Sequence, residues 1–450
     1  MWDKLIEDVT EVINNDAFIN IVLNKRIGTI SENDRKLYTK ILYGVVENKK
    51  WLDFLLRPYV SGKRVKPNVK NPLRVGVYAL SYLNLASHYV VNELVGVVKK
   101  KDYNGSKFVN GVFRNYIKED RFNKACEEIK KIASDERESI IYNIDVDVLK
   151  LIKKQYPNDY VDILKPVEET FNIYRINYLK TTDEEVIDYL NKNDIWFEKD
   201  EEMIITEVSL IQTTLFEQAL IIPQDASSMM VGKVLNPPYN ACVLDACSAP
   251  GSKSFHLATI MKNTGSITSC DIYPHKLKLI ENEALRQGIK NIKTLEADAR
   301  NFDYGKFYAY VLVDAPCSGM GTMKHKGDLK LRLTINKIKE IEKLQKDILN
   351  HIDNYVEPNG ILVYSTCTIN KSENEEQIRN FLKSHKNYQK VGEKCNRIID
   401  ELAARTVGGK YRNHKLSGID CNELHIDGDV LLIWKYYTIN KKTFYSYLML

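Results

Sequence analysis

Two cysteines that follow short apolar segments are the residues of this chain best suited to chemistry. Cys317 closes the segment YVLVDAPC, and Cys367 closes ILVYSTC. Each segment is rich in β-branched and aromatic residues, which is typical of a buried parallel strand. Each cysteine is therefore expected just beyond the carboxyl end of a strand, where open α/β sheets bind their ligands. A buried cysteine can be an ordinary small apolar residue, but two that each follow a strand favour a thiolate nucleophile.

A third segment of the same form, ACVLDACSAPGSKS, outlines a cofactor site. Asp245 ends its apolar run and Gly251 stands in the turn before the next expected helix, where backbone N–H groups face a ligand. The spacing matches neither the dinucleotide fingerprint nor the phosphate-binding P-loop. Asp271 and Asp298 end two later strands and could meet a ribose diol and an adenine edge. Acids at three successive strand ends favour a nucleoside-bearing cofactor without a phosphate chain, namely S-adenosylmethionine.

Alternating strands and helices are expected from residue 225 onward, which is the signature of a doubly wound α/β domain. Before it, NIYRINYL and MIITEV read as strands around the helical segment EEVIDYLNKN, which indicates a small α+β module. We place a helical domain at residues 1–134, linker helices and the α+β module at 135–224, and the α/β domain at 225–450. The strands expected in the α/β domain are Ala241–Asp245, Ser266–Asp271, Asn291–Leu295, Ala309–Asp314, Gly360–Ser365 and one near Val430–Trp434.

The N-terminal domain combines helical periodicity with concentrated positive charge. Pro58, Pro67 and Pro72 are expected to separate two of its helices. From Arg57 to Lys124 there are fourteen Lys and Arg against four Asp and Glu, a net charge of +10 where the whole chain carries +5. This excess predicts a polyanionic partner, although solvated helix faces could also carry it. Four tyrosines interleave with the charges and could stack on bases or belong to the core: Tyr78, Tyr82, Tyr89 and Tyr103.

Composition sets further limits on the class of protein. A chain of 450 residues is long enough for two or three domains. Its eight cysteines include no C-x-x-C pair, which argues against a structural zinc site, and we expect no bound metal. The charged N-terminus lacks the apolar core of a signal peptide, and no apolar segment approaches the ~20 residues that span a bilayer. We expect a monomeric cytoplasmic protein with reduced thiols and no membrane partner.

The motifs described above resemble those of a known family. DACSAPGSK, DAPCSG and STCTI resemble the three hallmark motifs of RNA cytosine-C5 methyltransferases, and QDASS at residues 224–228 resembles the segment that precedes them. NDRKLYTKILYGVV, WLDFLL, LRVGVYALSYL and FVNGVFRNYI resemble the NusB-like RNA-binding domain of the Sun-type 16S rRNA methyltransferases. The resemblance spans nearly the whole chain. It implies an all-α NusB-like domain followed by a Rossmann-like methyltransferase domain with a doubly wound sheet.

The resemblance also implies roles for particular residues. It matches Cys367 to the family's nucleophile, which adds to C6 of cytosine and so makes C5 nucleophilic enough to accept a methyl group. It matches Cys317 to the partner that helps remove the C5 proton and release the product. Asp314 would hydrogen-bond the N3 edge of the base. The implied S-adenosylmethionine site comprises Cys247, Ser248, Ala249, Pro250, Gly251, Ser252, Lys253, Asp271, Asp298 and Asp314, with Ser252 where the family usually has a second glycine.

The sequence therefore predicts an S-adenosylmethionine-dependent RNA cytosine-C5 methyltransferase that acts on RNA rather than DNA, with 16S rRNA as the expected substrate. Two alternatives stay open. The same chemistry could act on tRNA or another RNA, because nothing in the sequence encodes the target base. The chain could also be a non-catalytic NusB-like RNA-binding or assembly factor whose methylase half is a relic. The presence of Asp314, Cys317 and Cys367 argues against a relic, because a decayed site would lose its thiols first.

Overall fold

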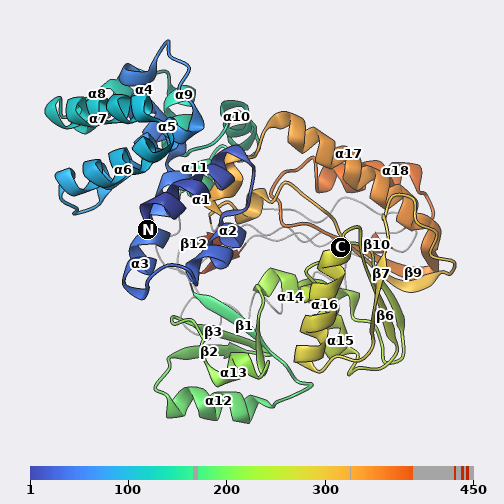
Figure 1. Ribbon diagram of the computed structural model, residues 1–450. Coiled ribbons are helices and arrows are strands. Elements are labelled where there is room, and N and C mark those ends of the chain that lie inside the picture. Colours follow the sequence, from blue (N-terminus) through green and yellow to red (C-terminus); the bar gives the residue numbers. More distant parts are fainter. Residues whose placement is uncertain (166–170, 325, 389–429, 432–436, 440–441, 445–450) are drawn as a thin grey trace. The chain divides into compact units, whose positions relative to one another are not determined.

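The computed structural model describes residues 1–165, 171–324, 326–388, 430–431, 437–439 and 442–444 (Figure 1). The chain forms two compact units, one of residues 1–166 and 323–335 and the other of residues 167–322 and 336–450. The predicted combination of a helical domain, a small antiparallel module and a doubly wound α/β domain is confirmed. The domain boundaries expected at 134/135 and 224/225 stay predictions.

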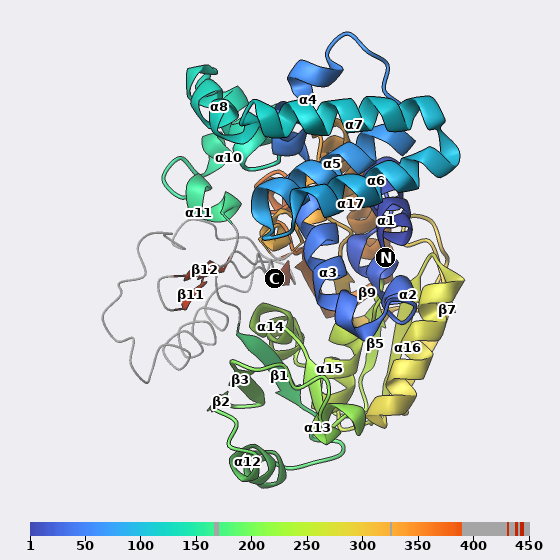
Figure 2. The ribbon, with the colours of Figure 1, turned by 60° about the vertical axis from the view of Figure 1, so that its left-hand side comes forward.

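Helices packed around one apolar core build the first unit. Tyr38, Leu73 and Phe113 from three of them are fully buried. Figure 2 shows α5, α6 and α7 side by side, and the close approach of α5 to α7 requires Gly76, where a Cβ would lie 2.2 Å from the Phe113 ring. The helices are α1 (Trp2–Asn14), α2 (Ile19–Ile27), α3 (Glu32–Glu47), α4 (Lys49–Val60), α5 (Pro67–Tyr82), α6 (Ser87–Lys101), α7 (Tyr103–Lys118), α8 (Arg121–Glu128), η1 (Ile129–Lys131), α9 (Ser134–Ile141), α10 (Val146–Gln155) and α11 (Tyr160–Leu164).

Two of the prolines expected between helices lie inside them instead. Pro67 is the first residue of α5, where its missing N–H has no intrahelical partner to lose, but Pro58 lies within α4 and Pro72 within α5. Each interior proline removes one backbone hydrogen bond. Buried neighbours such as Leu55 and Leu73 provide tertiary packing that outweighs this loss. The expectation that Pro58 and Pro72 separate helices is therefore wrong.

A short segment from far along the chain, residues 323–335, completes the helical unit and contains η3 (Gly327–Leu331). The buried side chain of Asp328 accepts a hydrogen bond from the backbone N–H of Ile19, the first residue of α2, at 3.2 Å. It also accepts one from the guanidinium of Arg332 at 3.2 Å. Arg332 also lies 4.1 Å from the centre of the Phe18 ring. Lys330 donates from Nζ to the last carbonyl of α11 at 2.6 Å. The segment that follows Cys317 in the sequence is thus a structural part of the helical unit.

Replacing Asp328 with alanine should loosen α2. The change removes the acceptor for the Ile19 N–H and the partner of Arg332, and it leaves buried polar groups unpaired. We expect the unfolding free energy of the helical unit to fall by about 1–3 kcal/mol. Hydrogen exchange at the Ile19 amide should become faster. Asp328→Asn keeps an acceptor oxygen, so its unfolding free energy should fall by less than that of the alanine variant. Unchanged exchange at Ile19 in the alanine variant would contradict the capping role.

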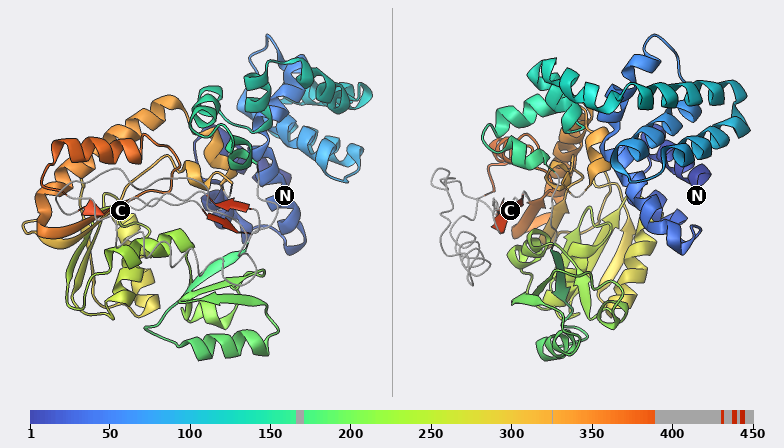
Figure 3. Two further views of the ribbon diagram at one scale, coloured as in Figure 1. Left: turned by 180° about the vertical axis from the view of Figure 1, so that it is seen from behind. Right: turned by 90° about the vertical axis from the view of Figure 1, so that its left-hand side faces the viewer.

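The α+β module is an antiparallel sheet with the strand order β2-β3-β1-β4. Helix α12 lies beside this sheet (Figure 3). Its Val186 and Leu190 pack on one face of the sheet, and Met229 of α14 packs on the other. The strands β1 and β3 were predicted. The strands β2 and β4 were not, because the first is mostly polar and the second is only three residues long. The elements are β1 (Asn172–Ile176), α12 (Asp183–Lys192), β2 (Phe197–Asp200), β3 (Met203–Thr206), α13 (Thr214–Glu217), β4 (Ile221–Pro223) and α14 (Ala226–Leu235).

The α/β domain contains a parallel sheet with the order β10-β9-β8-β5-β6-β7. The chain runs outward from β5 to β7, returns to β8 and continues to β9, so its direction reverses between β5 and β8. Ligands bind at such a reversal in open α/β sheets. The strands are β5 (Cys242–Asp245), β6 (Ser266–Asp271), β7 (Ile292–Glu296), β8 (Tyr308–Asp314), β9 (Val356–Ser365) and β10 (Val430–Leu431); of the last predicted strand, residues 432–434 lie outside the described residues.

Helices cover both faces of this sheet (Figure 1). Val243, Leu312 and Val363 point to one face, where α14, α15 and α16 pack. Their neighbours Leu244 and Tyr364 point to the other face, against α17 and α18. Because helices bury both of its faces, packing determines which face each side chain of a strand points to. The remaining elements are α15 (Ser252–Ile260), α16 (Pro274–Gln287), η2 (Met320–Thr322), α17 (Ile335–Ile352), η4 (Asp353–Tyr355), α18 (Glu375–Ser384), β11 (Tyr437–Ile439) and β12 (Lys442–Phe444).

Candidate active site

The register of β8 and β9 brings the two cysteines together. The strands pair in parallel with Asp314 opposite Ser365, and each cysteine lies in the loop directly after its strand. The two Sγ atoms are 3.2 Å apart, and the backbone N–H of Cys367 points to the sulfur of Cys317 at 3.3 Å. No disulfide joins them. The cysteines thus lie at the carboxyl edge of one sheet, as the strand pattern predicted.

The two thiols differ in their surroundings. Cys367 is exposed, whereas Cys317 is partly buried. A hydrogen bond with Cys367, together with burial, raises the pKa of the Cys317 thiol well above its ordinary value. Cys317 therefore keeps its proton, and the sulfur of Cys367 is the one that an incoming base can reach. Two thiols in such different surroundings can divide nucleophilic attack and proton transfer between them.

Asp314, the last residue of β8, joins this edge to the turn after β5. Its Oδ2 accepts Lys253 Nζ at 2.6 Å, and its Oδ1 accepts Ser365 Oγ at 2.7 Å. Burial alone would lower the pKa of Lys253. The nearby Asp314 carboxylate, followed by Cys367, outweighs this effect, so the pKa of Lys253 is raised and the lysine stays cationic. Sequence reasoning did not anticipate Ser365 as a partner of Asp314, because only the strand register reveals it.

The turn from β5 to α15 comprises the residues expected to hold a cofactor, Cys247 to Lys253. Gly251 has a φ of 105°, and a Cβ there would lie 2.4 Å from the Phe255 ring, so this position requires glycine. Ser252 is the first residue of α15. A serine is therefore accommodated where the family usually has a second glycine. The N-terminus of α15 begins directly at the turn, where helix N–H groups favour an anionic ligand group.

Asp245, at the end of β5, is a carboxylate without exposure to solvent. Ser254 Oγ donates to its Oδ2 at 2.7 Å, whereas its Oδ1 has no hydrogen bond of normal geometry to any described residue. Burial raises the pKa of Asp245 to about 7, against the favourable effects of Ser254 and of the nearby backbone N–H of Cys247. An unsatisfied buried carboxylate oxygen suits a ligand that carries positive charge or N–H groups.

The other two predicted acids are placed differently. Asp271 ends β6, is largely buried and accepts the backbone N–H of Tyr273 at 2.9 Å. Burial, followed by the charges of Asp245, Asp314 and Asp271, raises the pKa of the Cys247 thiol, so these three carboxylates share the surroundings of the turn. Asp298, after β7, is engaged by Arg300, whose Nε lies 2.9 and 3.1 Å from its two oxygens.

Of the fourteen Lys and Arg residues between Arg57 and Lys124, some are buried in structural contacts and the others are exposed to solvent. Arg74 is buried and binds both oxygens of Asp53 at 2.8 Å, and Arg121 is buried with its Nε on a backbone carbonyl of α4. Lys70 is half-buried beside Asp53. The other eleven are exposed: Arg57, Lys63, Arg64, Lys66, Lys99, Lys100, Lys101, Lys107, Arg114, Lys118 and Lys124. Most of the predicted excess therefore reaches solvent.

The four tyrosines that interleave with these charges also differ in their exposure to solvent. Tyr78 is buried in the core, whereas Tyr82 and Tyr89 are 43% exposed and Tyr103 is 57% exposed. The ammonium groups of Lys99 and Lys107 lie 5.9 and 4.6 Å from the centre of the Tyr103 ring. An exposed ring flanked by two cations can stack on a base while its neighbours meet phosphates.

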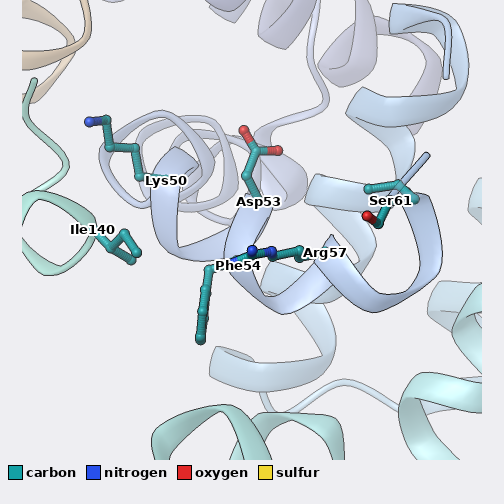
Figure 4. Close-up of a pocket in the computed structure, with 7 residues that line it drawn as sticks. Lys50, Asp53, Phe54, Arg57, Ser61 and Ile140 are labelled. Atoms are coloured by element: carbon teal, nitrogen blue, oxygen red, sulfur yellow. The ribbon is translucent and has the colours of Figure 1, made fainter. Parts of the chain in front are cut away.

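A hollow of about 300 Å³ lies in the helical unit along α4. Figure 4 shows Lys50 and Ile140 on one side of it and Ser61 on the other. Lys50 Nζ already donates to Ser139 and to a backbone carbonyl, at 2.8 and 2.6 Å. Asp53, which also lines the hollow, is occupied by Arg74 as described above. The Lys50 and Asp53 side chains that line the hollow are therefore already paired within the helical unit.

Two other classes of site are absent from the described ranges. Within them, His, Cys, Asp and Glu form no group of three or more that could hold a metal ion. None of the described helices has the length and hydropathy that a membrane crossing requires.

Comparison with known proteins extends the resemblance noted from the motifs. Residues 232–408 match the family model for the 16S rRNA methyltransferase RsmB/F, and residues 4–118 match that of the NusB family. A probable ribosomal RNA small subunit methyltransferase B of Bacillus subtilis is 31% identical over 412 residues, which cover 86% of this chain and 89% of that protein. The ribosomal RNA small subunit methyltransferase B of Shewanella oneidensis is 26% identical, over 86% of this chain and 90% of that protein.

Solved structures support the same architecture. The crystal structure of PH0851 superimposes with a TM-score of 0.69 and 26% identity, covering 85% of this chain and 90% of that one. A methyltransferase homolog protein from Pyrococcus horikoshii gives a TM-score of 0.51 at 26% identity, over 57% of this chain and 85% of that one.

The raised pKa of Asp245 predicts how stability changes with pH. The folded state holds a proton on Asp245 up to about pH 7, whereas an unfolded chain releases it near pH 4. The folded state thus binds more protons between these values, and this residue's contribution to stability falls as pH rises through the window. Asp245→Asn should therefore gain stability relative to the parent from pH 5 to pH 8, by at most about 4 kcal/mol.

Denaturant unfolding of both proteins at several pH values would measure this gain. Asp303→Asn, at an exposed turn, controls for the loss of any one carboxylate. A stability difference between Asp245→Asn and the parent that does not change with pH would contradict the prediction.

Proposed function

Because the chain belongs to the RsmB/F family of 16S rRNA methyltransferases, we propose that it methylates C5 of a cytosine in 16S rRNA, using S-adenosylmethionine and a covalent adduct at Cys367. One observation carries the proposal: two cysteines, not joined by a disulfide, have their sulfurs 3.2 Å apart at the carboxyl edge of a doubly wound sheet. The names of the relatives support rRNA as the substrate, and the NusB match supports an RNA-binding role for the helical unit.

The first step is the addition of the Cys367 thiolate to C6 of the cytosine. The new C–S bond moves electron density to C5, which is too electron-poor in the free base to accept a methyl group. Asp314 faces the N3 edge, where the ring gains negative charge, and passes a proton to N3 as the adduct forms. Lys253 and Ser365 hold the two oxygens of Asp314 and so fix its orientation toward the base.

The second step restores the ring. After methyl transfer C5 carries both the methyl group and its original hydrogen. Cys317, once it has released its own proton to water, takes the C5 proton, and the electrons of that C–H bond re-form the C5–C6 double bond. The Cys367–C6 bond breaks in the same step, Cys367 leaves as a thiolate, and N3 returns its proton to Asp314. The raised pKa of Cys317 makes its thiolate a strong base for this task.

The residues around the turn after β5 fit S-adenosylmethionine, which supplies an electrophilic methyl group when bound. Its positive charge suits the carboxylates of Asp245, Asp271 and Asp314, of which Asp245 keeps an oxygen without a partner. Asp271 would receive the ribose diol, and the turn at Gly251 would hold the methionine part. Asp298 fits least well, because Arg300 already binds both of its oxygens.

The substrate can be identified in the cell. Bisulfite sequencing of 16S rRNA from cells with and without this gene should reveal one cytosine that is protected only when the gene is present. If 16S rRNA is unchanged and a protected cytosine appears in tRNA instead, the chemistry stands and the proposed substrate is wrong.

The two cysteines should give opposite results when each is replaced. Cys367→Ala removes the nucleophile, so neither methylation nor a covalent adduct should form. Cys317→Ala leaves attack and methyl transfer intact but hinders removal of the C5 proton, so the covalent protein–RNA complex should accumulate. The measurement uses radiolabelled 16S rRNA transcribed in vitro, with S-adenosylmethionine and nuclease digestion before a denaturing gel.

Radiolabel that migrates with the protein on the denaturing gel shows that the covalent adduct has formed. An adduct in Cys367→Ala but none in Cys317→Ala would reverse the two roles. Normal methylation by both variants would exclude the thiolate mechanism altogether.

The exposed lysines around Tyr103 should contribute to RNA affinity by neutralising phosphates. Lys99→Gln combined with Lys107→Gln should weaken binding of the 16S rRNA transcript. It should also lower the slope of log K against log salt by about 0.7–0.9 for each phosphate that is no longer neutralised. Filter binding at several salt concentrations measures the slope. Lys130→Gln with Lys131→Gln, exposed in the same unit but outside the basic stretch, is the control pair. An equal slope in the two double variants would show that the charges near Tyr103 only meet solvent.

A further inference from the structure

A buried carboxylate that the proposed mechanism does not use lies behind the two cysteines. Glu373, between β9 and α18, has no exposure to solvent. Its Oε2 accepts the backbone N–H of Ser318 at 2.8 Å, and its Oε1 accepts the Ser318 hydroxyl at 2.5 Å. Ser318 directly follows Cys317. The carboxylate therefore holds the loop after β8 at the residue next to its cysteine.

The same carboxylate also holds the loop after β9. Asn370 donates from Nδ2 to Oε1 of Glu373 at 3.0 Å, and the Thr368 hydroxyl lies 3.4 Å from that oxygen. Thr368 directly follows Cys367, and its hydroxyl is 2.7 Å from that of Ser318. One side chain thus links the residues that follow the two cysteines.

Gln345 of α17 completes the arrangement on the other side of Cys317. Its Nε2 donates to the carbonyl of Pro316 at 3.0 Å and to Oε2 of Glu373 at 3.0 Å. The carbonyl before Cys317 and the N–H after it are therefore both held by this pair of buried side chains. The backbone around the thiol is constrained on both sides.

We propose that Glu373, supported by Gln345, is a positioning residue that fixes Cys317 against Cys367 for removal of the C5 proton. A buried carboxylate adds little to stability, because its desolvation offsets its hydrogen bonds, and an apolar residue of the same size can stabilise a fold as well. What the carboxylate provides is several acceptor sites in one rigid place. No neutral side chain offers as many to both loops.

This role, which rests on the covalent mechanism proposed above, predicts a particular defect. Cys367 would still attack, because Thr366 and Thr368 on either side of it stay bonded to the Asn374 side chain, at 2.6 and 3.0 Å. Cys317 would shift away from the C5 proton. Glu373→Gln keeps the shape of the side chain and replaces one acceptor oxygen with a donor. We expect turnover to fall up to about a hundredfold, the cost of displacing a reacting group by about 1 Å. The KM for S-adenosylmethionine should not change.

The covalent complex distinguishes this defect from a general loss of structure. With the radiolabelled 16S rRNA transcript, Glu373→Gln should accumulate the adduct although both cysteines are present, as Cys317→Ala does. Gln345→Met, which keeps the volume and removes the amide, should do the same to a smaller extent. Normal turnover in Glu373→Gln, or parallel loss of turnover and adduct, would overturn the positioning role.

A second readout does not depend on the reaction. Dibromobimane joins two nearby thiols, and peptide mapping identifies the Cys317–Cys367 product. Cross-linking should be several-fold slower in Glu373→Gln and Gln345→Met than in the parent. Equal rates would overturn the proposal. If neither Cys317→Ala nor Cys367→Ala forms an adduct while cross-linking still slows in these variants, the covalent mechanism fails, and Glu373 still positions the two thiols against each other.

Glu202→Gln is the matched control. Glu202 is a largely buried carboxylate of the same unit, in the turn between β2 and β3, and it is held by Lys233 at 3.1 Å and His256 at 3.3 Å. Its replacement should lower stability but should change neither the adduct nor the rate of cross-linking. The same defects in Glu202→Gln as in Glu373→Gln would show that both arise from general destabilisation and would overturn the proposal.

Discussion

The parallel register of β8 and β9 is the constraint on which the whole site depends. Pairing Asp314 with Ser365 places the loops of both cysteines at the same height on the sheet edge. A slip of one residue would turn every side chain of one strand to the opposite face. Val363 and Tyr364 would then exchange the helices against which they pack, and Ser365 could no longer reach Asp314. The hydrophobic layers on both faces thus protect the site indirectly, because they exclude a one-residue slip.

The electrostatics of the two units suit two ligands of opposite charge. The carboxylates near the turn after β5 favour a cationic cofactor, whereas the exposed lysines and arginines of the helical unit favour a polyanion. A uniformly basic protein would repel its cofactor, and a uniformly acidic one would repel its RNA. The modest net charge of +5 therefore conceals two strong local fields. Arg74 and Arg121 belong to neither, since both are buried in structural pairs.

Most of the fold could be predicted because its signals are local. Strand ends at Asp245, Asp271 and Asp314 follow from apolar runs that the structure reproduces. The cysteines could be assigned to one edge because parallel strands align their carboxyl ends. The contacts of Ser365 and Glu373 could not be predicted, because they depend on how two loops fold over one another. Tertiary packing also overrode a local rule where Pro72 continues a helix.

The segment of residues 323–335 has a consequence for the order in which the protein is made. The helical unit is synthesised first, yet the carboxylate that caps its second helix and the lysine that binds α11 belong to this later segment. Roughly 160 residues separate the two parts, or about 8–30 s of translation. During that interval the nascent helical unit is incomplete, and its polar contacts to the segment are unmade. The ribosome must therefore deliver most of the parallel sheet before the helical unit can reach its final state.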